Sequence, residues 1–410
     1  MFPRLVEGRI RAALADTPVV AINGPRQSGK TTLARSIAGD THRYLTLDDE
    51  NTFVAARDNP VGFVRDLDRA VIDEIQRAPR LMLALKQSID TDRRPGRFLI
   101  TGSANLLTMP RAQESLAGRV ELISLLPLAQ AEVRNTKTPS FIQNILEGRL
   151  PARIERGVTG DAIMEIALTG GYPEVLKRTD STRRTAWCRQ YLNAIVQRDL
   201  PDIAAVEKPA EARRLIDALA LQVGQLTNFS TLAGQLGLSS KTAESYFGLL
   251  EQLFIVRRLE AWQRNAFNRL VKTPKVHFWD TGLVAACQRL SIEKLRTDRK
   301  PLGALLEGFV FAELLKLAAS MDEQIRFSHY RDKDQVEVDF IVEGESSGLA
   351  GIEVKASATI ASGDFTGLKK LKSATGADFR LGVVLYDGDE VLTFGDRLWA
   401  APFASLWAAD

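Results

Sequence analysis

The chain has 410 residues, and this length predicts two to four domains, since single cores rarely grow beyond about 250–300 residues. Its hydrophobic content of 45% and charged content of 26% are ordinary for a soluble globular protein, and no run approaches the ~20 apolar residues that cross a bilayer. A net charge of +3 permits a nucleic-acid partner without arguing for one, and two cysteines exclude a disulfide framework. With no secretory-type apolar segment at the N-terminus, we expect a cytoplasmic protein without a membrane partner.

Residues 1–135 alternate short apolar runs with helical patterns. The apolar runs are residues 19–23, 44–47, 70–72, 98–101 and 120–125. Such alternation is typical of a parallel sheet with covering helices. The first part of the chain is therefore predicted to be an α/β domain.

A phosphate-binding loop follows the first apolar run. Residues 24–31, GPRQSGKT, match G-x-x-x-x-G-K-[ST] between the strand VVAIN and the helix TTLARSIA. Gly24 and Gly29 allow backbone conformations that turn N–H groups toward phosphate oxygens. Lys30 offers a cation to the β- and γ-phosphates, Thr31 offers a hydroxyl to Mg²⁺, and the helix start adds its positive dipole end. The sequence predicts an ATP and Mg²⁺ site whose binding residues are Gly24, Pro25, Arg26, Gln27, Ser28, Gly29, Lys30, Thr31 and Thr32.

Polar residues follow two later strands of this domain. Asp73 and Glu74 end the strand AVIDE, and we expect Asp73 to hold Mg²⁺ and Glu74 to polarise the attacking water as a general base. The strand FLIT ends in GSAN, where Ser103 and Asn105 compete for the role of sensing the γ-phosphate. Arg119, in LAGR, is a candidate arginine finger in cis or in trans, although an ordinary surface arginine is an equal alternative.

The segments GPRQSGKT, VIDEIQ, LITGSAN and LAGR together resemble the AAA-type ATPases of bacteria and archaea that carry a C-terminal domain of unknown function. The resemblance continues through TGGYPE at 169–174, Tyr191 with Arg198 and Asp199, and KVHFWDTG at 275–282. It covers essentially the whole chain. It implies an ATPase that can form a homo-oligomer. The chain departs from many such ATPases at the sensor strand, where Asn is usual.

Residues 136–205 are predicted to form a helical lid or linker, and residues 206–290 a winged-helix-like domain. The pattern from 211 to 262 is helix, helix, turn, helix and strands, with Gly237 in the turn and Ser239 or Ser240 as N-cap. A second helix of this kind can enter a DNA major groove, although it can equally bind protein or only pack. This helix carries Lys241 as its cation and displays Glu244. The cations expected to contact phosphates are Arg257, Arg258, Arg264, Arg269, Lys272 and Lys275.

Residues 291–410 are predicted to form an α/β domain like a restriction endonuclease. Asp339 lies in the strand VEVDFIV, and Glu353 and Lys355 share a face of the next strand, GIEVKA. This arrangement resembles the PD-(D/E)xK nucleases, and Glu307 on the amphipathic helix 300–319 matches the acid of their first helix. Asp339, Glu353 and Glu307 would be the metal ligands, with Lys355 beside the attacking water. Alternation in a half-exposed sheet produces the same pattern by chance, and the fold does not decide whether the site cuts.

Two functions follow from these predictions. The first is an ATPase that couples nucleotide state to DNA binding or to Mg²⁺-dependent DNA processing. The second is a non-cleaving, ATP-dependent switch that binds a protein or DNA. A role in a stress or toxin-like system has no residue pattern behind it.

Overall fold

The computed structural model describes residues 2–103, 118–151, 154, 157–203, 208–263 and 272–408. The chain divides into two compact units. Unit 1 comprises Met1–Leu128, Gln252–Phe254 and Ala319–Met321, and unit 2 comprises Ala129–Glu251, Ile255–Ala318 and Asp322–Asp410. Within the described ranges, no helix is long and apolar enough to span a bilayer. Each unit is described by itself below.

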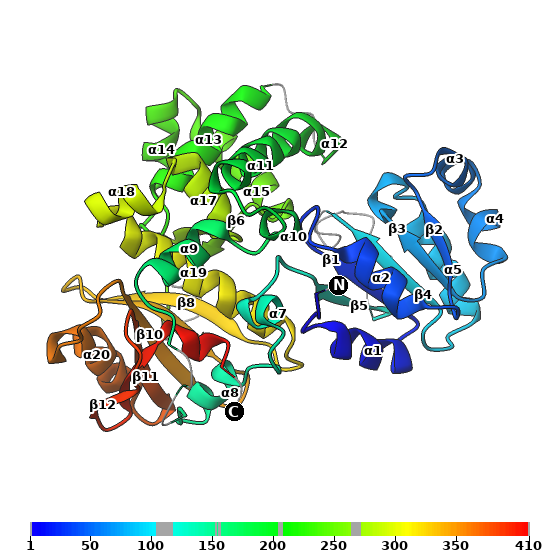
Figure 1. Cartoon of the computed structure of the whole chain (residues 1–410). Helices are drawn as coiled ribbons and strands as arrows, with labels where there is room; N and C mark the ends of the chain where they lie inside the picture. The colour runs from blue at the N-terminus through cyan, green and yellow to red at the C-terminus, as the bar shows by residue number, and fades with distance from the viewer. Residues whose placement is uncertain are drawn as a thin grey trace. The chain divides into compact units, whose positions relative to one another are not determined.

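The described part of unit 1 is built around a five-stranded parallel sheet, drawn in blue and cyan in Figure 1. The strand order is β2-β3-β4-β1-β5, and every neighbouring pair is parallel. The strands are β1 (Val19–Asn23), β2 (Arg43–Thr46), β3 (Ala70–Asp73), β4 (Phe98–Gly102) and β5 (Val120–Ser124). The sequence prediction of a parallel α/β sheet is confirmed, with strand ends that differ by at most one residue.

Helices cover both faces of this sheet because successive strand residues point to opposite sides. Val19 and Ala21 of β1 pack in one cluster with residues of α5, and Val20 and Ile22 pack in another with residues of α1 and α2. The helices are α1 (Glu7–Asp16), α2 (Lys30–Ala38), α3 (Glu50–Asp58), α4 (Pro60–Arg65) and α5 (Leu81–Thr91), with the 3₁₀ turn η1 (Ile75–Arg77) after β3.

Unit 2 begins with a helical region. Its helices are α7 (Gln130–Arg134), α8 (Phe141–Leu146), α9 (Asp161–Thr169), α10 (Pro173–Leu176), α11 (Ser181–Ala194), α12 (Leu200–Ile203), α13 (Pro209–Leu221), α14 (Phe229–Leu236), α15 (Ser240–Gln252), α17 (Thr281–Gln288) and α18 (Ile292–Thr297), and the π-turn η3 (Ile195–Asp199) continues α11. The strands β6 (Val256–Leu259) and β7 (Lys275–Phe278) form an antiparallel pair. Gly237 ends α14 with φ 70°, and Ser239 Oγ accepts from Thr242 N at 3.0 Å, so Ser239 rather than Ser240 caps α15. The helices, turn and strand pair expected for a winged helix are present, while the assignment to that fold stays a prediction.

The last part of unit 2 is a mixed six-stranded sheet in the order β12-β13-β11-β10-β9-β8. Its strands are β8 (Arg326–Arg331), β9 (Glu337–Glu343), β10 (Leu349–Lys355), β11 (Phe379–Tyr386), β12 (Leu392–Gly395) and β13 (Leu398–Pro402). The helices α19 (Lys300–Ala319) and α20 (Thr366–Thr375) and the 3₁₀ turns η4 (Ser362–Phe365), η5 (Gly376–Asp378) and η6 (Phe403–Leu406) accompany them. The expected strand pair around Asp339 and Glu353 is therefore an antiparallel hairpin of β9 and β10, turned by residues 344–348.

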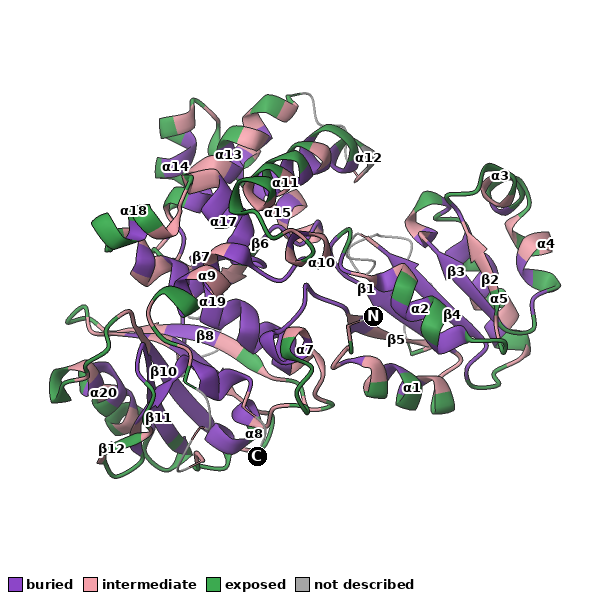
Figure 2. Cartoon of the chain, viewed as in Figure 1, coloured by how far each residue is buried: buried purple, intermediate pink, exposed green. Residues whose placement is uncertain are grey.

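One sequence expectation is corrected by helix α19. The helix has the predicted bounds, but it is buried along most of its length rather than amphipathic (Figure 2). Two charged residues are buried within it, Glu313 at 1% exposure and Lys316 at 6%, and their side chains pair at 2.8 Å. A helix whose own acid and base neutralise each other can be enclosed on all sides, and hydrophobic spacing alone does not reveal such a pair.

Candidate active site and comparisons

Two glycines shape the loop between β1 and α2. Gly24 has φ 146°, and a Cβ at this position would lie 2.1 Å from the carbonyl oxygen of Leu125. Gly29 has φ 100° and is the N-cap of α2. A side chain is excluded sterically at the first position and disfavoured by backbone conformation at the second. The loop therefore ends with the N–H groups of a helix start, which is a favourable place for phosphate.

Lys30 lies inside the curve of this loop. Its Nζ donates to the carbonyl oxygens of Gly24 at 3.0 Å and Pro25 at 2.8 Å, and the residue is 4% exposed. The loop is further fixed by Arg4, which donates to Ser28 O at 2.6 Å and to Leu126 O at 2.5 Å. A fixed loop with a buried lysine is preorganised for a triphosphate, because little ordering remains to be done on binding. Sequence reasoning missed Arg4, which matches no motif.

The remaining loop residues differ in exposure. Ser28 is buried, and its Oγ has no hydrogen-bond partner among the described residues. Arg26, Gln27 and Thr32 are exposed, and Gln27 has φ 63°. A buried hydroxyl without a protein partner is costly unless something else satisfies it, so Ser28 fits a loop that receives a polar ligand.

The carboxylate of Asp73, at the end of β3, accepts hydrogen bonds from three hydroxyl groups. Thr31 Oγ1 lies 3.1 Å from Oδ1 and 3.0 Å from Oδ2, Tyr44 OH donates to Oδ2 at 2.7 Å, and Thr101 Oγ1 donates to Oδ1 at 2.5 Å. Burial and the contact with Asp73 raise the pKa of Tyr44 to about 12, so the phenol stays a donor. The hydroxyl of Thr31 and the carboxylate of Asp73 are oxygen donors of the kind that Mg²⁺ prefers, and they fit the metal that accompanies ATP.

Glu74 leaves the strand in the left-handed conformation, with φ 59° and ψ 44°. Its N–H donates to Thr101 Oγ1 at 3.2 Å, and its carboxylate accepts from Gln76 Nε2. The same Nε2 donates to Ser103 Oγ at 2.9 Å. Gln76 therefore connects the expected base to the expected sensor. Sequence reasoning missed Gln76 and Tyr44, although Gln76 stands two residues after Glu74 in VIDEIQ.

One other predicted residue lies away from the loop. Arg119 precedes β5, whose first residue pairs with Val19, so it lies at the edge of the sheet opposite the loop. Five-residue strands separate these edges by about 13 Å. The Nε of Arg119 donates to Asp90 Oδ1 at 2.8 Å. The structure therefore does not bring Arg119 to the loop of its own chain, and the finger in trans stays a prediction. Asn105 lies outside the described residues.

In unit 2, a buried lysine stands among the acids expected to hold metal. Lys275 Nζ is 3.0 Å from Glu307 Oε1, 3.5 Å from Asp339 Oδ1 and 3.8 Å from Glu337 Oε2. Burial would lower the pKa of Lys275, but the carboxylates of Glu307 and Asp339 outweigh it and raise that pKa above its usual value. Burial and the charge of Asp339 raise the pKa of Glu307 to about 8. The prediction that Lys275 is one of the cations that contact DNA phosphates is wrong, because the side chain is buried against carboxylates.

The other predicted members of this cluster stand at its edge. Glu353 is 7% exposed, and burial and Asp339 raise its pKa well above the usual value. Lys355 Nζ is 3.8 Å from Glu353 Oε2, so the two side chains share a face as expected, and 4.0 Å from Asp364 Oδ1. Among the described residues, no three Asp, Glu, His or Cys side chains are grouped as a metal cage requires.

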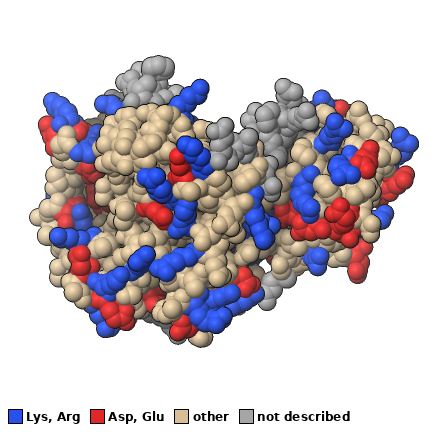
Figure 3. Space-filling model, turned by 90° about the horizontal axis from the view of Figure 1, so that it is seen from above, with Lys and Arg blue, Asp and Glu red and all other residues tan. Residues whose placement is uncertain are grey.

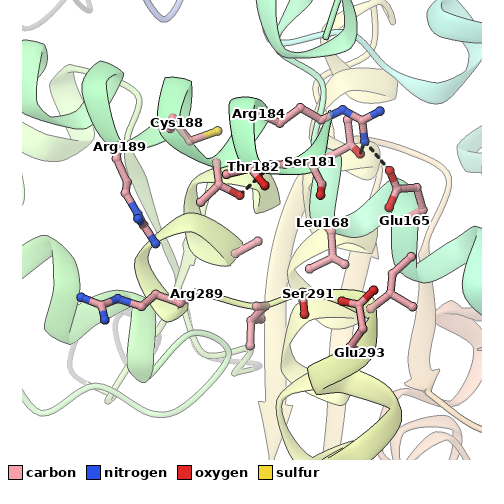
Figure 4. Close-up of a pocket in the computed structure, with 17 residues that line it drawn as sticks. Glu165, Leu168, Ser181, Thr182, Arg184, Cys188, Arg189, Arg289, Ser291 and Glu293 are labelled. Carbon is pink, nitrogen blue, oxygen red and sulfur yellow. Dashed lines mark hydrogen bonds and ion pairs between the residues drawn. The ribbon is translucent and has the colours of Figure 1, made fainter. Parts of the chain in front are cut away.

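A hollow of about 340 Å³ lies between α9, α11, α17 and the start of α18 (Figure 4). Arg189 and Arg289 lie on one side of it, and Glu165 and Glu293 on the other (Figure 4). Arg184 pairs with Glu165 and donates to Thr169 Oγ1 at 2.9 Å. Arg184 is thus neutralised in place, and the exposed positive charge of the hollow comes from Arg189 and Arg289.

Three known protein families match separate ranges of the chain. Residues 16–134 match the AAA domain, residues 160–294 match a domain of unknown function (DUF8612), and residues 302–406 match another (DUF4143). The parallel sheet, the loop geometry and the first match support an AAA-type P-loop ATPase, with binding and hydrolysis of ATP as its activity.

Relatives that match almost the whole of this chain show which family it belongs to. The chain is 32% identical over 399 residues to the uncharacterized protein Rv2008c of Mycobacterium tuberculosis, covering 96% of this chain and 82% of that protein. Mb2031c of Mycobacterium bovis is equally similar, and MJ1544 of Methanocaldococcus jannaschii is 21% identical over 422 residues, covering 98% and 90%. The chain belongs to the family of the two mycobacterial proteins.

Solved structures are more distant. AMPPCP-bound DnaA from Aquifex aeolicus is 13% identical and covers 60% of this chain and 86% of that one, with a TM-score of 0.26. Domain III of the Thermotoga maritima replication initiation protein DnaA is 16% identical and covers 34% and 73%, with a TM-score of 0.24. Scores this low carry no argument about function.

Proposed function

We propose that this chain hydrolyses ATP with Mg²⁺ at the loop of residues 24–31, and that its nucleotide state controls binding to a protein or DNA partner without cutting it. The observation that carries the ATPase proposal is the row of polar groups at the carboxyl ends of β3 and β4. Hydrogen bonds join Thr31 to Asp73, and Gln76 to both Glu74 and Ser103. Thr101 links the two sets, since its hydroxyl donates to Asp73 and accepts from Glu74 N.

Each group in this row has a distinct role in the proposal. Lys30 turns from the loop carbonyls to the β- and γ-phosphates, and Thr31 and Asp73 offer oxygen ligands. Bound Mg²⁺ would neutralise charge on the transferred phosphoryl group. Glu74 takes the proton of the attacking water as the bond to ADP breaks, and Gln76 holds its carboxylate in position.

The ATPase proposal is tested by Glu74→Gln. The variant keeps its ATP affinity, because Lys30 and the loop are untouched, and turnover falls about 10²–10⁴-fold because the base is lost. Phosphate release and nucleotide binding are measured on the same preparations. Glu50→Gln, at an exposed position on α3, is the control. Full turnover in Glu74→Gln would reassign the base.

The described cations of the winged-helix-like region favour a switch over sequence-specific DNA reading. The Arg257 guanidinium lies 5.0 Å from the ring centre of Trp279, and that of Arg258 lies 4.7 Å from Phe247. Both arginines therefore pack on aromatic side chains. Lys272 is exposed, and Arg264 and Arg269 lie outside the described residues. On the face drawn in Figure 3, the basic side chains of the described residues lie among acidic ones and form no single stripe, and a stripe is the usual footprint of a DNA-binding surface.

ATP-dependent assembly follows from the switch. A homo-oligomer that forms with ATP would let Arg119 reach a neighbouring nucleotide. Light scattering with ATP, with ADP and without nucleotide measures the assembly, and Lys30→Ala abolishes the ATP effect. Identical masses in all three states would count against the switch.

DNA processing is the second candidate. The observation that favours it is the shared face of Glu353 and Lys355 beside Asp339. It requires cleavage of some DNA with Mg²⁺ or Mn²⁺ that is lost in both Asp339→Ala and Lys355→Ala. Cleavage that survives both substitutions would remove this candidate.

A further inference from the structure

We infer that Lys275, rather than a divalent metal ion, is the cation that Glu307 and Asp339 hold. The buried ion cluster then fastens β7 to α19 and β9, and it is a structural junction instead of a nuclease centre. This inference does not depend on ATP hydrolysis at the loop of unit 1.

The contacts place the ammonium between the two carboxylates. Lys275 Nζ is 3.0 Å from Glu307 Oε1 and 3.5 Å from Asp339 Oδ1, and its side chain is 4% exposed. The second oxygen of Asp339 accepts from Val354 N at 2.9 Å. Both oxygens of Asp339 and the nearer oxygen of Glu307 therefore already have partners within the chain.

A divalent ion does not fit beside this ammonium. Mg²⁺ requires oxygen ligands at about 2.0–2.1 Å in octahedral geometry. An ion at that distance from the same two oxygens would lie within a few ångströms of Nζ, in a buried place where like charges repel strongly. Glu307 and Asp339 therefore do not hold a divalent metal between them unless Lys275 leaves.

The backbone holds Lys275 in position. It pairs with Leu259 in the β6–β7 ribbon and forms an isolated bridge with Leu226. Gly224 lies directly over Glu307, since a Cβ there would be 3.1 Å from Oε2. The lysine and its first acid are thus enclosed by neighbouring backbone, and moving the ammonium away requires opening this packing.

His277 does not supply a second cation. Its Nε2 is 3.6 Å from Glu307 Oε1. The ring is, however, fully buried against Phe311 and Phe340, and this burial lowers the pKa of His277 and disfavours its charged form. Lys275 is the buried cation that contacts both Glu307 and Asp339 among the described residues. Lys355, more exposed, stands by Glu353 at the edge and provides a matched control.

The test is Mn²⁺ binding to the nucleotide-free full chain, followed by electron paramagnetic resonance. Wild type and Asp339→Asn are expected to bind Mn²⁺ alike, which shows that no wild-type site uses Asp339. Lys275→Gln is expected to gain a site at least about tenfold tighter than any in wild type, and Lys275→Gln/Asp339→Asn to lose it. Lys355→Gln gains none.

A wild-type Mn²⁺ site that disappears in Asp339→Asn would overturn the inference, and so would the absence of any gain in a folded Lys275→Gln. If the variants fail to fold, wild-type crystals soaked in MnCl₂ decide. An anomalous peak between Glu307 and Asp339 contradicts the inference, and no peak there together with the ordered ammonium supports it.

Discussion

The hydroxyl of Thr31 lies against the carboxylate of Asp73, 3.1 Å from Oδ1 and 3.0 Å from Oδ2. Thr31 is the second residue of α2 and Asp73 is the last residue of β3, so the contact joins the phosphate loop to the strand that the expected base, Glu74, follows. Tyr44 and Thr101 hold the same carboxylate from two further strands. The candidate metal ligands are therefore oriented by the protein.

This contact predicts the magnesium dependence of ATP turnover. Thr31→Val removes one oxygen ligand and should raise the Mg²⁺ concentration for half-maximal turnover about 10–100-fold, since a contact to a charged group contributes about 1.5–3 kcal/mol. The measurement is phosphate release at fixed ATP over a range of free Mg²⁺. Thr91→Val, at the exposed end of α5, should keep the wild-type requirement. An unchanged requirement in Thr31→Val would remove Thr31 from the metal site.

Gln76 is expected to act on turnover through Glu74. Gln76→Ala should lower kcat about tenfold without changing ATP affinity, because it frees the carboxylate without touching the loop. A purely structural role would instead lower the melting temperature and leave kcat of the folded protein intact. Gln87→Ala, exposed on α5, is the control. A loss of ATP affinity in Gln76→Ala would place Gln76 at the nucleotide instead.

Arg119 should leave ATP affinity unchanged when it is replaced by alanine, because it lies at the opposite edge of the sheet from the loop and pairs with Asp90. If it acts on a neighbouring chain, turnover per chain falls in the variant at protein concentrations where wild type assembles. Titrating turnover against protein concentration measures this effect. Weakened ATP binding by dilute Arg119→Ala would contradict the observed position.

The two cysteines should be unreactive in the native protein. Burial raises the pKa of Cys188 well above its usual value and that of Cys287 to about 12. Since the thiolate is the reactive form, a disulfide reagent at pH 7.5 should label both at least about 100-fold more slowly than in guanidinium. Absorbance of the released thiolate gives both rates. Fast labelling of native protein would contradict the packing around α11 and α17.

The parallel sheet could be predicted because its signals are local. Each strand is a short apolar run, and residues 24–31 fix the place where the first strand meets a helix. The same motif identified Lys30 and Thr31. Asp73 and Glu74 could be identified because they are two acids at the end of an apolar strand that follows the loop in the sequence. Their roles in catalysis stay predictions until they are measured.

Tyr44, Gln76 and Lys275 could not be found in this way, since each acts through contacts between distant segments. Lys275 is the last of six basic residues scattered over positions 257–275, and it was expected with them to contact phosphate. Its burial depends on Glu307, 32 positions further along the chain, and on Asp339 after that. Lys275 is buried because it pairs with carboxylates that are distant in the sequence, and such pairing cannot be predicted from the residues next to it.

The most direct test of the account is ATP binding by Lys30→Ala. Isothermal titration with Mg²⁺-ATP should give saturable binding to wild type and at least about 100-fold weaker binding to the variant, because a buried charge-assisted phosphate contact is lost. Lys86→Ala, on α5, should bind like wild type. Wild type that ignores ATP at millimolar concentration, or equal binding by Lys30→Ala, would contradict the account.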